Sequence, residues 1–174
     1  MDRLATRLGE SFGLEIHRKM PSFDPETAFD KSRGQYNSTI LLRLLLLEMA
    51  ESSELVLGVT GADLFVPVLT YVFGEAQLGG SAAVVSMNRL PPEVYGLPKN
   101  DELLYDRLVK EAVHELGHCF GLVHCANPAC VMRSSTYVED IDLKEAWYCL
   151  VCEQTVNASE KTPESPPSGR RFGR

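Results

Sequence analysis

The residues whose types and spacing indicate chemistry lie between His114 and His124, in the run HELGHCFGLVH. His114 and His118 are four residues apart, so on a helix both imidazoles project from the same face, one turn apart. Gly121 permits the positive φ with which a chain leaves a helix sharply, and this turn would return His124 to the same point. Three imidazoles leave one tetrahedral position of a zinc ion open, as in a catalytic rather than a structural site.

Glu115 follows the first histidine and lies off the stripe of metal ligands, so its carboxylate can approach a zinc-coordinated water without binding the metal. A zinc ion lowers the pKa of its water and polarises a carbonyl, and a carboxylate in this place would act as general base. The residues therefore predict a zinc-dependent hydrolase. The alternative is a non-catalytic zinc-binding interaction module, against which the intact Glu115 argues, because such a module needs no base.

Four cysteines form a second pattern, in which Cys125-x4-Cys130 is followed by Cys149-x2-Cys152. Two such pairs suit a closed, structural zinc site of four thiolates, which would stabilise a segment too small for its own core. Two disulfides or an iron–sulfur cluster are the competing interpretations. Because Cys125 directly follows His124, folding of this segment would also help to fix the third histidine. The expected cofactors are two Zn²⁺ per chain, one catalytic and one structural.

A long helix from about 101 to 119 is expected to carry the first two histidines. Its polar stripe includes Arg107 and Glu111, which are spaced to pair with each other. Alternatively, Glu111 orients a ligand imidazole. Cys119 fits neither metal pattern and is expected to be a buried thiol beside the helix end. The apolar face of this helix comprises Leu104, Leu108, Val109, Ala112, Val113, Leu116 and Phe120.

The rest of the chain alternates helical and strand patterns, which predicts an α/β (α+β) layered domain. Helices are expected over about 4–12, from Ser38 or Thr39 to about 52, and over 142–148. Strands are expected over 14–17, over 55–60, late in 66–73, and over 82–87, with a turn at 74–81. The expected organisation is an N-terminal subdomain (1–121), a C-terminal subdomain (122–152) and a flexible polar tail (153–174).

The run HExxHxxGxxH is the metzincin signature. Together with Cys125-x4-Cys130-x-Met132 and the later cysteine pair, it closely resembles the archaemetzincins, which are small zinc metallopeptidases. The similarity covers most of 34–152 and includes Gly58-Val59-Thr60, Asp63-Leu64-Phe65 and Phe73-Gly74-Glu75-Ala76. It implies a metzincin-like mixed sheet with packed helices and a small C-terminal zinc knuckle.

The resemblance also implies a role for each matching residue. It makes Glu115 the general base and Met132 the methionine of the turn below the metal. His114, His118 and His124 would hold the catalytic zinc, and Cys125, Cys130, Cys149 and Cys152 would hold the structural zinc. One difference is that the family commonly begins with a β-strand, whereas this chain starts almost at its first helix, so the edge of the sheet is expected to differ.

Two further expectations concern the substrate. The strand over 82–87 is expected to align a peptide by β-augmentation, as an upper strand does in metzincins, with an ordinary core strand as the alternative. Tyr137 is a candidate for stabilising the developing oxyanion, with a plain surface tyrosine as the alternative.

Composition excludes several classes of partner. The chain of 174 residues has 17 Lys and Arg against 24 Asp and Glu, a net charge of −7, which argues against nucleic acid or an anionic membrane. No apolar run approaches the roughly 20 residues that span a bilayer, and no signal peptide is visible. A cytoplasmic, monomeric protein acting on a peptide or protein substrate is expected.

Overall fold

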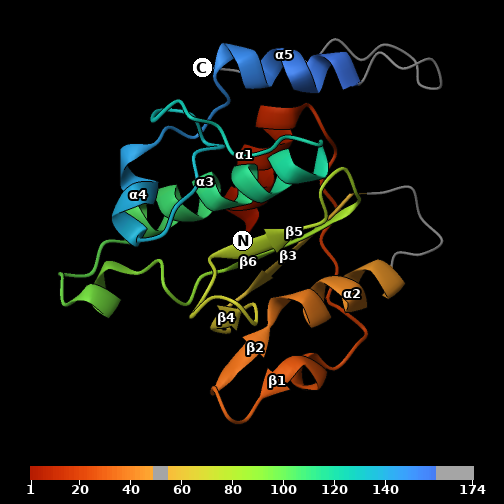
Figure 1. Cartoon of the computed structure of the whole chain (residues 1–174), viewed down its shortest axis with the longest axis vertical. Coiled ribbons are helices and arrows are strands. Elements are labelled where there is room, and N and C mark those ends of the chain that lie inside the picture. The colour runs from red at the N-terminus through yellow and green to blue at the C-terminus, as the bar shows by residue number, and fades with distance from the viewer. Residues whose placement is uncertain (49–54, 160–174) are drawn as a thin grey trace.

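The computed structural model describes residues 1–48 and 55–159, and it places a long helix, α3, between a small mixed sheet and an N-terminal helix (Figure 1). α3 spans Asp101–Cys119, as the sequence predicts. Asn100 caps it, because its side-chain oxygen accepts a hydrogen bond from Leu103 N at 3.0 Å, and two acidic residues in the first turn complement the helix dipole. The cap and the apolar face fix where α3 starts and which side it buries.

The sheet behind α3 has the strand order β3-β6-β5. β3 (Val56–Thr60) pairs with β6 (Ala82–Ser86) in parallel, and β5 (Gly74–Ala76) pairs with β6 in antiparallel. β6 is buried throughout, as its run of small and β-branched residues predicts for a central strand. β5 therefore forms one edge of this sheet, next to α3.

A second sheet has the order β1-β2-β4, with β1 Phe29–Asp30, β2 Gln35–Asn37 and β4 Leu64–Phe65. The short 3₁₀ helix η1 (Pro25–Ala28) leads into it, and the apolar helix α2 (Ser38–Glu48) follows β2. α2 packs against β5 and β6 of the first sheet and against β2 of the second, and it buries Leu41, Leu42 and Leu45. The expected extension of this helix to about 52 lies outside the described residues.

The N-terminal helix α1 (Asp2–Phe12) packs against α3 through Leu4, Leu8 and Phe12, the stripe that the sequence predicts. No strand follows it, so the alternation in 14–17 does not produce the expected strand. Residues 14–17 pair with neither of the two sheets.

The segment after α3 differs most from expectation. A 3₁₀ helix, η2 (Pro92–Tyr95), precedes α3, whereas α4 (Val138–Leu143) and α5 (Leu150–Ser159) follow it. The helix expected over 142–148 is therefore wrong, because Lys144 ends α4 and α5 starts later. The tail expected from 153 is helical to Ser159, since α5 buries Cys152 and Val156 in the main core.

No helix in the described part of the chain is long and apolar enough to cross a membrane.

The strand predicted late in 66–73 is also absent, apart from a single bridge between Val72 and Leu64. The true strand, β5, lies in the segment expected to be a turn. The hydrogen bonds from Ser86 N to Phe73 O (2.8 Å) and from Gln77 N to Ala82 O (2.9 Å) extend the pairing at both ends of β5. Its glycine and short side chains give little sequence signal for a strand.

Candidate active site and metal centres

Three imidazoles converge at the C-terminal end of α3. The ring centroids of His114, His118 and His124 lie 4.8 to 5.3 Å apart. His114 Nε2 lies 3.2 Å from His118 Nε2, close to the ~3.3 Å that separates two nitrogens on one tetrahedral zinc with bonds of ~2.0 Å. The three ligand atoms all lie within 4.8 Å of one another, so the spacing in the sequence does bring these residues together.

Backbone carbonyls fix the orientation of two of these rings. His114 Nδ1 lies 2.8 Å from Val131 O, and His118 Nδ1 lies 2.7 Å from Leu122 O. A carbonyl only accepts hydrogen bonds, so in each ring Nδ1 carries the proton and Nε2 keeps a free lone pair. Burial and the nearby Lys144 charge hold the pKa of His114 well below its usual range, which keeps its imidazole neutral, as a metal ligand must be.

The turn after α3 returns His124 to the first two histidines. Gly121 has φ of 85°, the left-handed conformation that glycine adopts without strain, as predicted. Gly121 N donates to His118 O at 2.9 Å and Leu122 N donates to Gly117 O at 3.0 Å, so the orphan carbonyls of the helix end are satisfied. His124 itself is exposed, on the open side of the cluster.

Glu115 lies beneath the edge strand. Glu115 is only 5% exposed. It packs directly against Gly74, because a Cβ built on that glycine would lie 2.7 Å from both Cγ and Oε1 of Glu115. Burial raises the pKa of this carboxyl well above its usual range, and the carboxylates of Glu111 and Glu75 add to that effect while Lys144 opposes it. A carboxylate in such surroundings takes up a proton readily, which suits a general base.

A buried ion pair lies one turn before His114 on α3. Lys144 Nζ is 2.9 Å from Glu111 Oε1, at an angle that misses hydrogen-bond geometry, and the two side chains are 0% and 4% exposed. Arg107 instead pairs with Asp142 through two hydrogen bonds of 2.7 Å. The expected pair between Arg107 and Glu111 is therefore wrong. The alternative, that Glu111 orients a ligand imidazole, is not supported for His114 or His118, because Nδ1 of each bonds to a backbone carbonyl.

Met132 lies under the histidine cluster and is fully buried. A Cβ on Gly117 would collide with Met132 Sδ and would lie 3.1 Å from the Tyr148 hydroxyl. That hydroxyl donates to Val113 O at 3.0 Å, and Met132 O accepts from Cys125 N at 2.9 Å. Gly117 therefore permits the methionine turn to approach the helix between its two histidines.

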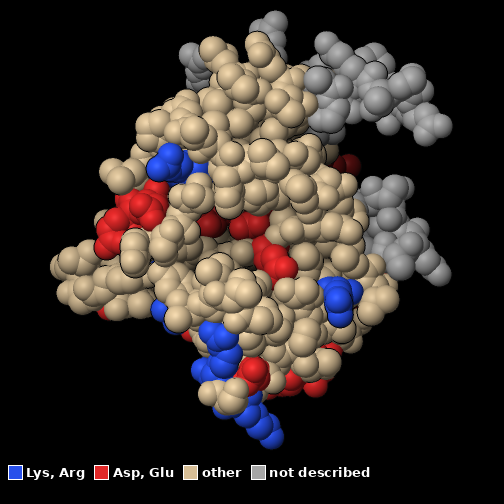
Figure 2. All heavy atoms as spheres, in the orientation of Figure 1, with Lys and Arg blue, Asp and Glu red and all other residues tan. Residues whose placement is uncertain are grey.

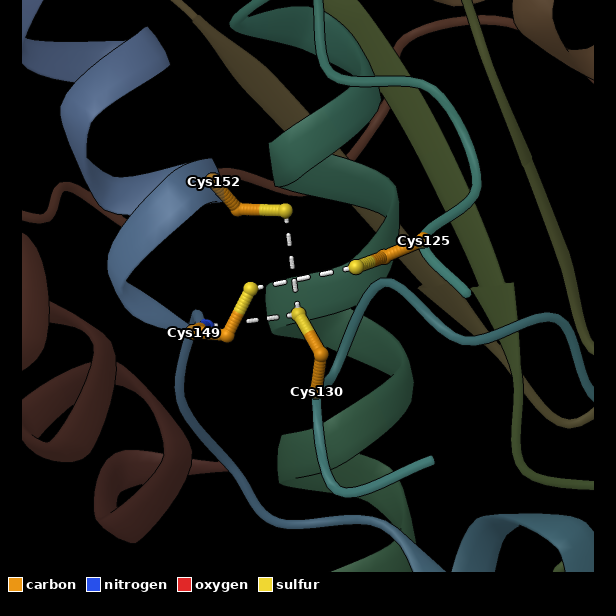
Figure 3. A group of neighbouring side chains, drawn as sticks. All are labelled: Cys125, Cys130, Cys149 and Cys152. Atoms are coloured by element: carbon orange, nitrogen blue, oxygen red, sulfur yellow. Dashed lines mark hydrogen bonds between the residues drawn. The ribbon is translucent and has the colours of Figure 1, made fainter. Parts of the chain in front are cut away.

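The four cysteines converge from two segments, as Figure 3 shows: Cys125 and Cys130 follow α3, whereas Cys149 and Cys152 flank the start of α5. The Cys125–Cys149 and Cys130–Cys152 sulfur pairs are both 3.8 Å apart. That separation matches the ~3.8 Å edge of a tetrahedron with Zn–S bonds of ~2.3 Å and is far longer than a disulfide of ~2.05 Å. All five cysteines are free thiols, so the disulfide alternative is not supported.

The thiols differ in how readily they ionise. Burial on its own raises the pKa of Cys149, but hydrogen bonds from the Cys152 N–H and from neighbouring thiols lower it to about 7. Burial raises the pKa of Cys119 to about 12, and its Sγ lies 3.4 Å from Ala82 O. Cys119 is thus the inert buried thiol that the sequence predicts, outside both clusters.

A hollow runs between α3 and β5 across one face of the molecule, with acidic side chains on its floor (Figure 2). β6 cannot pair with a substrate along it, because β3 and β5 occupy both of its edges, so the expected role for 82–87 is wrong. Register places the N–H and C=O groups of Gly74 and Ala76 on the outer edge of β5, where no other described strand pairs.

Tyr137 is 65% exposed at the start of α4. Its expected role in stabilising the developing oxyanion stays a prediction.

Comparisons with known proteins agree with this geometry. The family model described as Peptidase family M54 matches residues 22–158. The archaemetzincin of Methanocaldococcus jannaschii is 46% identical over 151 residues, which cover 86% of this chain and 80% of that protein. The crystal structure of archaemetzincin from Methanopyrus kandleri superposes with a TM-score of 0.80 at 39% identity, covering 92% of this chain and 86% of that one. The structure of a zinc-dependent peptidase from Methanocorpusculum labreanum gives a TM-score of 0.79 at 31% identity, covering 89% and 92%.

The matched region contains the three histidines, the buried glutamate, the methionine turn and the four cysteines. The fold is therefore the mixed α/β architecture of the archaemetzincins, and the chain belongs to peptidase family M54, a family of metallopeptidases.

Proposed function

We propose that this metallopeptidase hydrolyses peptide bonds at a zinc ion held by His114, His118 and His124, with Glu115 as general base. The observation that carries the proposal is the convergence of three imidazoles, two of them with Nε2 freed by carbonyl hydrogen bonds, beside a buried carboxylate. When bound, a zinc ion would lower the pKa of a coordinated water and polarise the scissile carbonyl. Three ligands leave the position that this chemistry needs.

The chain's own residues supply the proton transfer and the alignment. Glu115 accepts the proton of the attacking water and delivers it to the leaving amine. The outer edge of β5 offers the backbone groups of Gly74 and Ala76 to an extended peptide, next to the carboxylate of Glu115. Met132 supports the helix from below and does not itself ligate.

We also propose a second, structural zinc held by Cys125, Cys130, Cys149 and Cys152. It joins the segment after α3 to the start of α5, and the turn that presents His124 ends beside its first ligand. The chain then divides into an N-terminal subdomain to 121, which carries β5 and α3, and a C-terminal subdomain of 122–152, which carries the third histidine and the cysteines.

The test is cleavage of a defined peptide library by purified, zinc-loaded protein, compared with the Glu115→Gln variant. We expect wild-type cleavage that a chelator abolishes, and a loss of about 10²–10⁴-fold in the variant, because the base is removed. Elemental analysis should give two zincs per chain in both proteins. Undiminished cleavage by Glu115→Gln would remove the proposed base, whereas two zincs without any wild-type cleavage would favour the non-catalytic zinc-binding module.

A further inference from the structure

An open cavity of about 620 Å³ lies beside the N-terminal end of β5, outside the metal centres. Arg89 Nε and Nη2 donate to the two oxygens of Asp63 at 2.6 and 2.7 Å. Arg33 has no ion-pair partner among residues 1–48 and 55–159. Two guanidinium groups and one carboxylate give the cavity a charge of +1, in a chain whose formal net charge is −7. The side chains that line it belong to Arg33, Gln35, Asp63, Thr70, Tyr71 and Arg89.

The guanidinium group of Arg33 is held in place without a counterion. Its Nε donates to Gln35 Oε1 at 3.2 Å, and its Nη2 donates to Leu69 O at 2.8 Å and Thr70 O at 3.2 Å. The group lies over the Phe65 ring, 4.1 Å from its centroid. Its Nη1 has no hydrogen-bond partner in the described part of the chain. A fixed guanidinium with a free N–H edge binds an anion at little cost in side-chain entropy.

The second arginine, Arg89, connects the cavity to β5, along whose outer edge the substrate is proposed to lie. Arg89 lies over the Tyr71 ring, 4.2 Å from its centroid, and the Tyr71 ring contacts Phe73 edge-on at 5.5 Å. Phe73 directly precedes Gly74, against which Glu115 packs. Figure 2 shows basic side chains below the hollow, over β2 and β4. The cavity therefore lies at the end of the hollow where β5 begins.

Strand direction decides which part of a peptide reaches this end. A substrate that pairs with the outer edge of β5 in the antiparallel sense, which is the more stable one, runs from Ala76 towards Gly74. The residues after the scissile bond then extend towards Tyr71 and the two arginines. Charge selects the same direction, because a positive cavity attracts the C-terminal carboxylate of a peptide and repels its N-terminal amine.

We infer that the cavity between Arg33 and Arg89 binds a carboxylate of the substrate on the C-terminal side of the cleaved bond, an inference that rests on the proposed peptidase function. This carboxylate comes either from the end of the peptide or from an Asp or Glu side chain. The free Nη1 of Arg33 suits both, because each offers a carboxylate oxygen that can accept a charge-assisted hydrogen bond from it. The site would make the enzyme prefer acidic groups a few residues beyond the cleaved bond.

The test starts from a peptide that the zinc-loaded wild type cleaves. It is resynthesised with a free C-terminal carboxylate, with a C-terminal amide, and as amides with Glu or Gln at each position after the cleaved bond. We expect kcat/KM to favour the acid over the amide by about tenfold or more, the effect of one charged hydrogen bond. Rescue of the amide by Glu but not by Gln would assign the site to an acidic side chain, and no rescue would assign it to the chain end.

Variants separate the cavity from the catalytic site. Arg33→Gln should remove the preference for the carboxylate and leave cleavage of the amide unchanged, whereas Arg33→Lys should keep part of the preference. Arg43→Gln, at an exposed arginine of α2, is the matched control and should behave as wild type. Melting curves and zinc content check that each variant folds.

Binding without turnover provides the independent measurement. The zinc-loaded Glu115→Gln protein is titrated with the acid and amide forms of the peptide. The double variant Glu115→Gln/Arg33→Gln is titrated in the same way. Cleavage that proceeds equally for acid and amide, with Arg33→Gln equal to wild type, would overturn the carboxylate site and leave the peptidase function intact. Absence of any wild-type cleavage would instead refute the proposed function. A titration with peptides of the library in their acid and amide forms would then still decide whether Arg33 recognises a carboxylate.

Discussion

At the scale of single residues, Gly74 links the edge strand to the proposed base. A Cβ at this position would lie 2.7 Å from Glu115 Cγ and Oε1 and 2.7 Å from Val84 O. The backbone of β6 cannot yield easily, so in Gly74→Ala we expect Glu115 to be displaced. Because a small misplacement of a catalytic group is costly, kcat should fall by about 10²-fold while both zincs remain bound.

Gly61→Ala is the matched control, because a Cβ at Gly61 has open space around it and φ there is not positive. Its kcat and zinc content should equal those of wild type. The comparison uses initial rates on one peptide together with elemental analysis. Full activity in Gly74→Ala would show that Glu115 does not depend on its contact with the strand.

The sequence could predict the residues whose roles depend on local spacing. The histidine pair, the turn at Gly121 and the two cysteine pairs follow from helical periodicity and ligand chemistry, and the structure brings each set together. It could not predict the roles of Gly74, which lies 40 residues before His114, or of Lys144, which lies between the two cysteine pairs, because both reach the site only through tertiary packing. A glycine at the start of a short strand and a lysine in a polar segment carry no local signal of burial.

At the scale of elements, the buried pair of Lys144 and Glu111 ties the end of α4 to α3. Lys144 also donates to Arg133 O at 3.2 Å, next to the methionine turn. In Lys144→Met, Glu111 stays buried without a counterion, and we expect the free energy of unfolding to fall by about 3–5 kcal/mol. The double variant Lys144→Met/Glu111→Leu should recover most of this loss, because no unpaired charge is left.

Denaturant unfolding of both variants measures the stability change, and the pH profile gives a second readout. Lys144 lowers the pKa of Glu115 and Glu111 raises it. In Lys144→Met the pKa of Glu115 should therefore rise, and the acidic limb of kcat/KM should move to higher pH. The double variant should move the limb back. If Lys144→Met is as stable as the double variant Lys144→Met/Glu111→Leu, then Lys144 and Glu111 do not stabilise each other.

Element boundaries could be predicted only where the pattern was long. α3 has an N-cap, an apolar face and a defined end, and its bounds match the prediction. β6 is a run of apolar residues and was expected to align the substrate, but the same property makes it central and covers both of its edges. The edge strand β5 has little hydrophobicity because one side faces the hollow, so its pattern looks like a turn.

At the scale of the whole molecule, the cysteine cluster brings together the segment after α3 and the start of α5. The segment from Leu122 to Cys149 contains one short helix, α4, and many turns. It contacts α3 through buried residues such as Met132, through the ion pair of Lys144 and through the hydrogen bonds of Asp142 and Tyr148. His124 and Cys125 are adjacent, so the conformation of the third histidine depends on that of the cluster. Loss of the cysteine-bound zinc should therefore weaken the histidine site as well.

Cys149→Ser tests this dependence, with Cys119→Ala as the control, since Cys119 is buried but outside the cluster. We expect Cys149→Ser to lose one zinc per chain and to melt at least about 10 °C lower, because a structural zinc contributes several kcal/mol of folding free energy. Its remaining zinc should be lost at a lower chelator concentration than the same zinc in Cys119→Ala, because His124 is no longer held. Two zincs and an unchanged melting temperature in Cys149→Ser would mean that the four thiols do not form a structural site. One zinc with unchanged resistance to chelation would mean that His124 is positioned by the turn at Gly121 alone.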